Sequence, residues 1–452
     1  MCEIKIKSLL SILISKSIIN LSKVLFKGGT NFPGKIALKL DKNILRIVSK
    51  NYKVILITGT NGKTTTTSMI YDVIKSSNKS VITNSTGANL ETGITSCFID
   101  NYRFNNETLD KYAVIEVDEA NLKFITEYIV PEIIIITNLF RDQLDRYGEV
   151  YTTLNKILEG IVKSPKSVLL LNGDESLLGD LKVPNPLVYY GFECSPNKST
   201  TVDINADAKF CKKCKNAYSY EFITYNHLGK FYCEKCGYKR PPLDYFVNSI
   251  EELTTSSSLV KINDTEYTIS QPGVYNIYNG LCAVGAARIL GIDEEIIVSS
   301  LKNTVSSFGR QESIQINGKE VKIILVKNPA GYNEALNTVS LDKRSLNLCM
   351  LLNDNYADGR DVSWIWDVDF EQLSNLNISN TIVGGQRLYD MAVRLKVAGL
   401  DYSKFSVCEN HETILKSIEN CDGEIVYILA TYTAMINFRK FLHGKKLIKD
   451  LW

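Results

Sequence analysis

The segment VILITGTNGKTT, residues 54–65, is an apolar, β-branched run that turns into a glycine loop and then into a helix-like stretch. Glycines let backbone N–H groups close around phosphate oxygens, and the following helix start adds the positive end of its dipole. Ile57 replaces the first glycine of the general G-x-x-x-x-G-K-[ST] pattern, so the loop is a shortened variant. A chance match is the alternative, but strand, turn and helix signals come in the required order. We therefore expect an ATP site made by Gly59, Thr60, Asn61, Gly62, Lys63, Thr64 and Thr65.

Length and composition narrow the class of protein. A chain of 452 residues exceeds one ordinary hydrophobic core, so we expect two or three domains. With 52 Lys and Arg against 50 Asp and Glu, the net charge gives no sign of a nucleic-acid partner. Eleven cysteines, four clustered and the others scattered, do not form the pattern of a secreted disulfide framework. We expect a reducing, cytoplasmic location.

Residues 1–46 form an N-terminal segment in which apolar residues recur with lysines between them, as in an amphipathic helix. Lys16 interrupts the apolar stretch and no small-residue cleavage site follows, so we expect neither a signal peptide nor a spanning helix. Two interpretations stay open. The helix docks on the body of the protein, or it contacts an anionic membrane at the inner face through Lys5, Lys7, Lys16 and Lys23. The apolar residues are Leu9, Leu10, Ile12, Leu13, Ile14, Ile18, Ile19, Leu21, Val24 and Leu25.

Apolar runs after the loop alternate with helical patterns, as buried parallel strands do in a doubly wound α/β domain. The runs lie at residues 80–84, 112–120, 132–140, 167–176 and 186–191. Acidic residues lie at the end of the run at 112–120, where strand ends gather ligands. A carboxylate there can complete the shell of Mg²⁺ with the Thr64 hydroxyl, and the strand period favours Glu116 over Asp118 and Glu119. Helix capping or surface solvation is the alternative for any one of these carboxylates.

A second motif consists of Cys211-x-x-Cys214 and Cys233-x-x-Cys236 with eighteen residues between them. Two such knuckles can hold four thiolates tetrahedrally around Zn²⁺, so we expect a structural zinc ribbon inserted at residues 203–242. A redox dithiol or four unrelated thiols are the alternatives. His227 lies between the knuckles, and we interpret it as a surface or ribbon-core residue because four cysteines already suffice.

The segments TGTNGKTTT, VIEVDE and TNLFRDQLDRYGE resemble the ATP-binding centre of the Mur ligases, which make amide bonds in peptidoglycan precursors. The similarity continues through LNGDES, GVYNIYNGLCAVGAA and FGRQE and covers nearly the whole chain. It implies a central ATP-binding domain at residues 47–311, an adenine-side helix carrying Asn276 and Asn279, and a nucleotide contact from Arg310. It also implies that ATP phosphorylates a carboxylate and that an amine attacks the acyl phosphate, with Lys63 and Mg²⁺ offsetting charge.

Departures from the family pattern are equally informative. Only some fifty residues precede the phosphate loop, too few for the family's UDP-binding domain. Gln143 replaces a histidine that in these ligases often follows the strand ending in Thr137-Asn138, and ILVKNPAG at residues 324–331 lacks the aspartate and histidine of the usual third-domain motif. The C-terminal domain, residues 312–452, is therefore an altered one. Its apolar runs at residues 346–352, 379–384 and 425–430 again predict α/β structure, with a hinge near residues 310–315.

The zinc ribbon, the short N-terminus and the segment LNDNYADGRDVSWIWD at residues 352–367 resemble one subgroup of the family, the MurT subunits. The resemblance implies amidation of the D-glutamate α-carboxylate of lipid II to D-isoglutamine, with ammonia from a GatD-like glutamine amidotransferase subunit. It also implies that Asp361 completes the catalytic triad of that partner. The alternative is a structural role, in which Asp358, Asp361 and Asp367 are turn or cap residues around a buried strand at residues 364–366. A ligase that adds an amino acid without a glutaminase partner is the alternative function.

The sequence contexts of the three histidines indicate that glutamine is hydrolysed on another chain. A glutaminase needs an activated cysteine paired with histidine. His227, His411 and His443 lie in no recognisable nucleophile context, and Cys408 near His411 is the nearest approach. We therefore expect the nucleophile on another chain.

Overall fold

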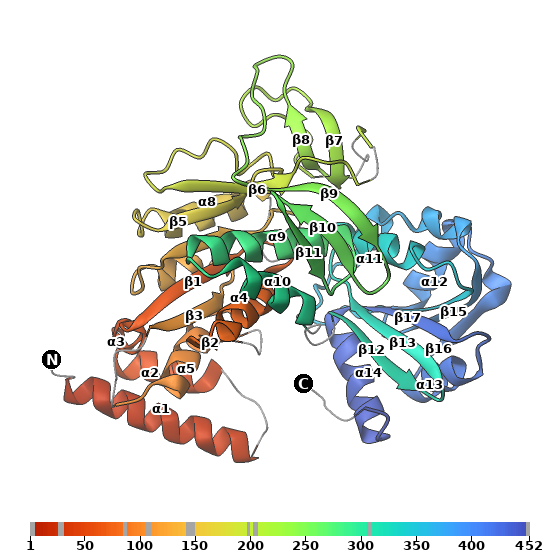
Figure 1. Ribbon diagram of the computed structural model, residues 1–452. Coiled ribbons are helices and arrows are strands. Elements are labelled where there is room, and N and C mark those ends of the chain that lie inside the picture. Colours follow the sequence, from red (N-terminus) through yellow and green to blue (C-terminus); the bar gives the residue numbers. More distant parts are fainter. Residues whose placement is uncertain are drawn as a thin grey trace.

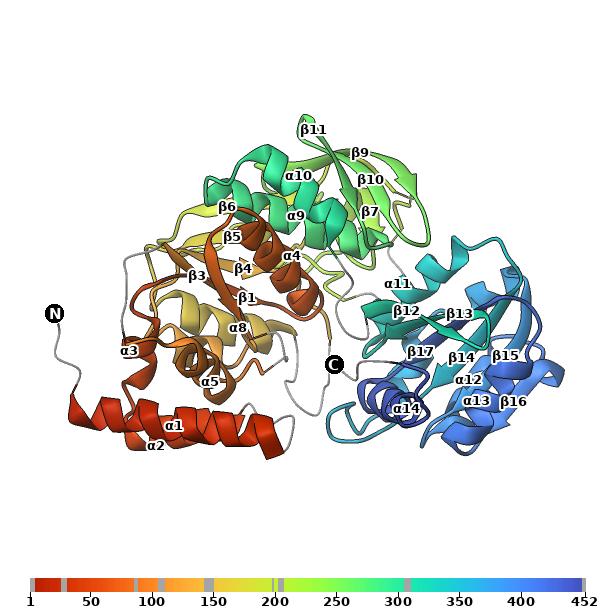
Figure 2. The same cartoon turned by 60° about the horizontal axis from the view of Figure 1, so that its bottom comes forward.

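A computed structural model describes residues 5–25, 31–84, 88–104, 110–141, 150–196, 199–201, 207–304 and 310–448. Two α/β bodies lie side by side, and a small β-hairpin projects from the first of them (Figures 1 and 2). No helix within these described ranges is long and apolar enough to cross a membrane. Gln143 and the other residues between Arg141 and Val150 lie outside the described ranges.

The first body is built on a sheet with the strand order β11-β10-β9-β6-β5-β4-β1-β3-β2 among the described residues. The strands from β6 to β2 pair in parallel, and β9 also pairs in parallel with β6, whereas β10 and β11 extend the sheet antiparallel. The expected parallel α/β domain is therefore confirmed, with an antiparallel edge that the sequence did not indicate. The strands are β1 (Tyr52–Thr58), β2 (Ser80–Thr83), β3 (Lys111–Glu116), β4 (Ile133–Ile136), β5 (Val168–Asn172), β6 (Leu187–Phe192), β9 (Tyr245–Leu253), β10 (Ser258–Ile262) and β11 (Thr265–Ile269).

Helices cover both faces of this sheet, because the central strands are apolar on both sides. Ile55 and Ile57 of β1 pack in one core with α4, α9 and α10, whereas Val54 and Leu56 pack in a second core with α1, α2, α3, α5, α6 and α8. The helices are α1 (Ile6–Leu25), α2 (Asn31–Leu40), α3 (Ile44–Ser49), α4 (Lys63–Ser76), α5 (Glu91–Asn101), α6 (Leu122–Ile125), α8 (Val150–Ile161), α9 (Val274–Ile289) and α10 (Glu294–Asn303).

Helix α1 docks on the body of the protein, as one of the two interpretations of the N-terminal segment expects. Its buried stripe, however, differs from the apolar set that the sequence suggests. Among its described side chains, Ser8, Ser11, Ile12, Ser15 and Ile19 are buried. The Ser8 hydroxyl donates to Asp41 Oδ2 at 2.6 Å and the Ser11 hydroxyl to the Ala37 carbonyl at 3.1 Å. Small hydroxyl side chains thus let α1 approach α2 closely, and most of its leucines face outward.

The second body has the strand order β12-β13-β17-β14-β15-β16. Helices α11 and α12 pack on one face of this sheet, and α13 and α14 on the other. The expected α/β pattern of the C-terminal region is confirmed. Its elements are β12 (Arg310–Ile316), β13 (Lys319–Leu325), α11 (Pro329–Ser340), β14 (Leu346–Leu351), the 3₁₀ helices η1 (Ser363–Asp367) and η2 (Phe370–Asn375), β15 (Ile378–Gly384), α12 (Leu388–Val397), η3 (Tyr402–Lys404), β16 (Phe405–Cys408), α13 (His411–Asn420), β17 (Ile425–Ala430) and α14 (Tyr432–Gly444).

The expected junction of the two bodies coincides with a strand of the second body. The hinge expected near residues 310–315 lies inside β12, which pairs antiparallel with β13 from Arg310 to Ile316. The division expected between residues 311 and 312 also falls within this strand. The sequence did not indicate this strand, because a charged segment such as RQESIQI resembles a linker until its ladder partner is known. A boundary ahead of Arg310 fits the two sheets better.

Candidate active site

The phosphate-type loop connects the end of β1 to the start of α4. Gly59 and Gly62 adopt positive φ angles of 119° and 86°. A Cβ on Gly59 would lie 2.4 Å from Thr137 Oγ1, and one on Gly62 would lie 2.3 Å from Asn279 Oδ1. Both positions therefore need glycine for conformation and for space. The backbone N–H groups at the start of α4 can then face an anion, as the sequence predicts.

Lys63 is the first residue of α4, and its side chain folds back over the loop. Its Nζ donates to the carbonyl oxygens of Gly59 and Thr60 and lies 2.8 Å from Glu119 Oε1. Both Lys63 and Glu119 are buried, with exposed fractions of 9% and 5%. The ammonium charge is thus held inside the loop at low dielectric, where its electrostatic effect on a phosphate is strongest.

Glu116 and Thr64 lie together at the same edge of the sheet. The Thr64 hydroxyl donates to Glu116 Oε2 at 2.7 Å, and Asn89 Nδ2 donates to Glu116 Oε1 at 3.1 Å. Asn84 holds the Glu116 backbone from both sides, through its N–H and its carbonyl. A buried carboxylate beside a hydroxyl, next to a phosphate loop, is a donor set that suits Mg²⁺. The neighbouring Asp118 instead accepts from the Ala120 N–H and the Asn121 side chain, so it serves as a local cap.

Asn61 connects the loop to the second body. Its backbone N–H donates to Asn138 Oδ1 at 2.8 Å, and its side-chain oxygen accepts from Asn328 Nδ2 at 3.0 Å. Asn328 is the N-cap of α11, where its Oδ1 accepts from the Gly331 N–H. The altered motif at residues 324–331 therefore still places an amide against the phosphate loop.

Asn276 and Asn279, expected from the resemblance, lie on α9 against the start of α4. Asn279 Oδ1 accepts from the Thr66 hydroxyl at 3.2 Å, and its Nδ2 donates to Asn276 Oδ1 at 2.9 Å. The structure therefore brings Asn279 to the phosphate loop, and Asn276 holds the Asn279 side chain from behind. Arg310 begins β12, but its side chain lies outside the described part of the chain.

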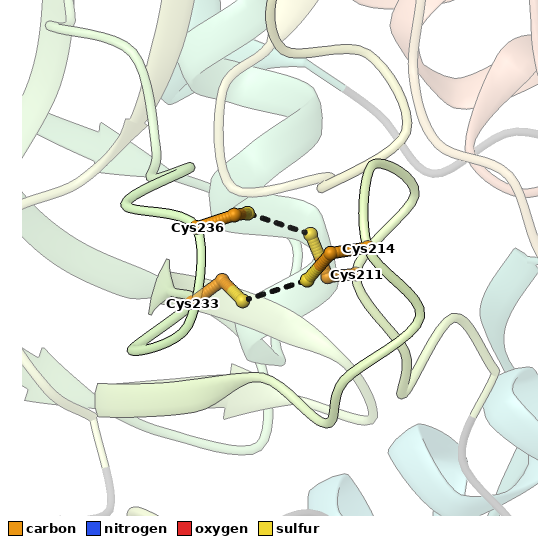
Figure 3. A group of neighbouring side chains, drawn as sticks. All are labelled: Cys211, Cys214, Cys233 and Cys236. Carbon is orange, nitrogen blue, oxygen red and sulfur yellow. Dashed lines mark hydrogen bonds between the residues drawn. The ribbon is translucent and has the colours of Figure 1, made fainter.

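The four cysteines of the paired knuckles come together at the base of the β-hairpin β7 (Ser219–Tyr225) and β8 (Leu228–Tyr232), as Figure 3 shows. Their Sγ atoms all lie within 4.8 Å of one another. The two knuckles are built alike: the N–H of Lys215 donates to the Cys211 carbonyl and that of Gly237 to the Cys233 carbonyl, and both donors have positive φ. Four thiols at this spacing from two matched turns are a metal-binding arrangement.

The LNGDES segment anchors this insertion to the sheet, a role that the sequence did not reveal. Asp174 is fully buried and accepts from Arg240 Nη1 at 2.9 Å and from the Tyr278 hydroxyl of α9 at 2.6 Å. Beside it, His227 Nε2 lies 2.8 Å from Glu175 Oε2. His227 is fully buried, so of the two interpretations, surface or ribbon core, the surface one is wrong, and its place outside the cysteine cluster agrees with the sequence. Burial alone would lower its pKa, but the Glu175 carboxylate outweighs burial and raises it.

Asp361 lies far along the chain, on the exposed surface of the second body. Its Oδ1 accepts from the Ser363 N–H at 2.8 Å, and hydrogen bonding from Ser363 lowers its pKa, so it is a carboxylate at neutral pH. Asp358 is buried and accepts from the Thr433 N–H at 2.7 Å, which confirms its structural role. Residues 364–366 lie in the 3₁₀ helix η1 and not in a buried strand, and Trp366 is half exposed.

Comparisons with known proteins agree with this arrangement. The family model of the Mur ligase middle domain matches residues 57–234, and that of the MurT ligase C-terminal domain matches residues 325–435. Among solved structures, a pseudomurein peptide ligase type C from Methanothermus fervidus has a TM-score of 0.66 at 21% identity and covers 95% of this chain and 85% of its own. A MurF ligase from Thermotoga maritima in complex with ADP has a TM-score of 0.61 at 13% identity, with 90% and 85% covered. At these identities the structures show the fold alone.

The fold and the phosphate loop thus define a Mur-ligase-type α/β protein. The subunit MurT of the glutamine-hydrolysing lipid II isoglutaminyl synthase of Streptococcus pneumoniae is 44% identical over 421 residues, 93% of this chain and 94% of that protein. The subunit of the same name from Staphylococcus aureus strain COL is 37% identical over 383 residues, 84% of this chain and 85% of that protein. The chain belongs to the MurT family of Mur ligases.

Proposed function

We propose that this chain amidates the α-carboxylate of D-glutamate in the lipid II stem peptide, giving D-isoglutamine, with ATP as the energy source and ammonia as the nucleophile. The observation that carries the proposal is the similarity to two MurT subunits over most of the chain, combined with a phosphate loop in which Lys63 pairs with Glu119 and Thr64 with Glu116. A ligase that adds an amino acid without a partner is the alternative.

The reaction needs two steps at one place. A carboxylate oxygen of the substrate attacks the γ-phosphorus of ATP, and ADP leaves. Ammonia then attacks the acyl carbon, a C–N bond forms, and phosphate and a proton leave. The loop N–H groups and Lys63 offset negative charge as phosphoryl transfer proceeds. Mg²⁺, held by Thr64 and Glu116, would supply further charge neutralisation across the phosphates. Asn276, Asn279 and Arg310 would hold the nucleotide.

The second body supplies a surface for the partner that makes ammonia, a GatD-like glutamine amidotransferase. Asp361 is exposed and charged, as a residue that orients a histidine on another chain must be. Large exposed apolar side chains lie in the loop between β14 and η1, on η1 itself and on the neighbouring helix α12, whose Arg394 donates to the Ile365 carbonyl. Cys408 and His411, the nearest approach to a nucleophile pair in the sequence, have other neighbours. The Cys408 thiol lies by the Ser417 hydroxyl, whereas the His411 ring packs on Phe438 and Phe441. The exposed side chains are Tyr356, Trp366, Tyr389, Val393 and Val397.

Incubation of the pure chain with Mg·ATP and lipid II separates the proposal from its alternative. We expect amidated lipid II, detected by mass spectrometry, when ammonium is added, and with glutamine only when the amidotransferase is also present. Product with an added amino acid in place of ammonium would favour the alternative function. The absence of product with ammonium, while ATP still binds, would contradict the proposed reaction.

We also propose that Cys211, Cys214, Cys233 and Cys236 hold one structural Zn²⁺. All four coordination positions are then filled by thiolates, so the ion serves folding and not catalysis. The support is the convergence of the four Sγ atoms and the burial of Cys211 and Cys233 in a small aromatic core with Tyr218, Tyr220 and Phe231. Because that core alone is small, the metal contributes much of the stability of the insertion.

Replacement of one ligand should therefore release the metal and loosen the insertion. We expect Cys214→Ser to lose stoichiometric zinc, measured by elemental analysis, and to melt several degrees below the parent protein. Cys421→Ser is the matched control, because Cys421 is also partly exposed but lies far from the cluster. An unchanged zinc content in Cys214→Ser, or an equal loss in the control, would contradict a four-cysteine site.

We propose that the enzyme works in the cytoplasm at the inner face of the membrane, where a lipid-linked substrate is held. The charge balance of the whole chain, +2, gives no support for a nucleic-acid partner.

A further inference from the structure

Helix α1 presents an apolar strip to solvent on the side opposite its docked face. Ile6 is 78% exposed, Leu10 51% and Leu21 58%, and Leu13 and Ile14 lie between them. These positions recur at helical spacing, whereas the buried residues of the same helix lie half a turn away. In Figure 1, α1 forms the outer edge of the first body, with α2 and α5 between it and the sheet. This apolar strip is interrupted on its outer face by the exposed Ser17, and an apolar strip on an outer edge is a surface that marks a binding site.

The charge around the strip narrows the class of partner. Residues 5–50 contain ten lysines and arginines against one carboxylate, Asp41, although the chain as a whole is nearly neutral. Asp41 is buried and accepts from Ser8 on the inner side of α1, so it does not offset the outer charge. Lys5 and Lys7 are exposed at the N-terminal end of the strip, and Lys35, Lys39 and Lys42 are exposed on and just after α2.

We propose that this strip, residues 6–21 of α1, with the lysines beside it, lies on an anionic phospholipid membrane surface. Leucine and isoleucine side chains would enter the boundary between headgroups and acyl chains, while lysines contact anionic headgroups. The docked serine face keeps α1 parallel to the surface of the protein, so its outer side can lie flat on the membrane. This proposal rests on the proposed function only in the purpose that it gives the membrane contact, which is to keep the enzyme beside a lipid-linked substrate.

The position of α1 fits that purpose. Lys16 donates to the Tyr102 carbonyl at the end of α5, and the Gly34 N–H of α2 donates to Ser96 Oγ of α5. The segment that leads into α5 carries Asn89, which holds Glu116 of the candidate active site. One layer of helices thus connects the strip to the site.

Vesicle flotation tests the surface without ATP or substrate. We expect the protein to float with vesicles that contain phosphatidylglycerol, to bind phosphatidylcholine vesicles at least about tenfold more weakly, and to lose binding at about 0.5 M salt. The variant Leu10→Ser/Leu13→Ser/Ile14→Ser should lose most of the binding. The variant Phe124→Ser/Val130→Ser/Val162→Ser removes equally exposed apolar side chains elsewhere on the first body and should bind like the parent protein.

A second variant, Lys5→Gln/Lys7→Gln, leaves the apolar strip intact and should bind anionic vesicles about tenfold more weakly. Unchanged flotation of both α1 variants, or no flotation of the parent protein, would overturn the proposal. If the parent protein dimerises and the triple serine variant does not, the strip binds a second copy of the chain. If addition of the amidotransferase prevents flotation of the parent protein, the strip binds that partner. Amidation in detergent micelles should be unchanged in both α1 variants, so a failed reaction and a failed membrane contact are distinguishable.

Discussion

Replacement of Lys63 by methionine should lower ATP-dependent amidation by at least about 10³-fold. The ammonium group is held among loop carbonyl oxygens and the Glu119 carboxylate, within the loop that we expect to bind the phosphates. Its loss removes the one side-chain charge that the loop directs at the phosphates. The measurement is the rate of ADP release with ammonium and lipid II at saturating ATP.

A structural effect must be separated from a catalytic one, because Lys63→Met leaves the buried Glu119 carboxylate without its cation. Breaking such a pair costs about 3–5 kcal/mol. The double variant Lys63→Met/Glu119→Gln removes both charges and should regain most of the lost stability but none of the activity. Lys75→Met, at an exposed position near the end of the same helix, should retain both. Recovery of turnover in the double variant would show that Lys63 acts through folding alone.

The phosphate loop illustrates how much of the site the sequence can predict. Its residues are contiguous, and their glycine conformations follow from local backbone geometry, so Gly59 to Thr65 could be identified without coordinates. The amide partners of the loop could not be identified in this way. Asn328 contacts Asn61 across 267 positions of sequence, and Asn279 contacts Thr66 across 213. A family resemblance named Asn279, whereas Asn328 stood in a motif that had lost its usual charged residues.

The same distinction holds for the fold. Strands β1, β3, β4, β5, β14 and β17 are short apolar runs whose residues are mostly buried on both faces, which sequence patterns reveal well. Strands β9 to β11 carry exposed charges on one side and two register shifts, so their pattern is mixed. In α1 the helical period was recognisable, but which stripe faces inward was not. That choice was made by the close contacts of Ser8 and Ser11 with α2.

Replacement of Asp361 by asparagine should lower glutamine-dependent amidation by about a hundredfold or more and leave the ammonium-dependent reaction within about twofold. Asparagine keeps the oxygen that accepts from the Ser363 N–H, so the local turn should persist. It removes the negative charge that would orient and stabilise a protonated histidine on the amidotransferase. The assay compares both nitrogen sources with the same preparation of the assembled two-subunit enzyme.

Asp401 supplies a matched control for this prediction. It is exposed on the same body, and its Oδ1 accepts from the N–H of Ser403 two residues on, at 3.0 Å, which repeats the local geometry of Asp361. Asp401→Asn should leave both nitrogen sources unaffected. Gel filtration of the Asp361→Asn variant with its partner should still show the complex, because one lost surface charge is a small part of an interface. Equal loss with ammonium and with glutamine would place Asp361 in the ligase reaction itself, and a dissociated complex would make it an assembly residue.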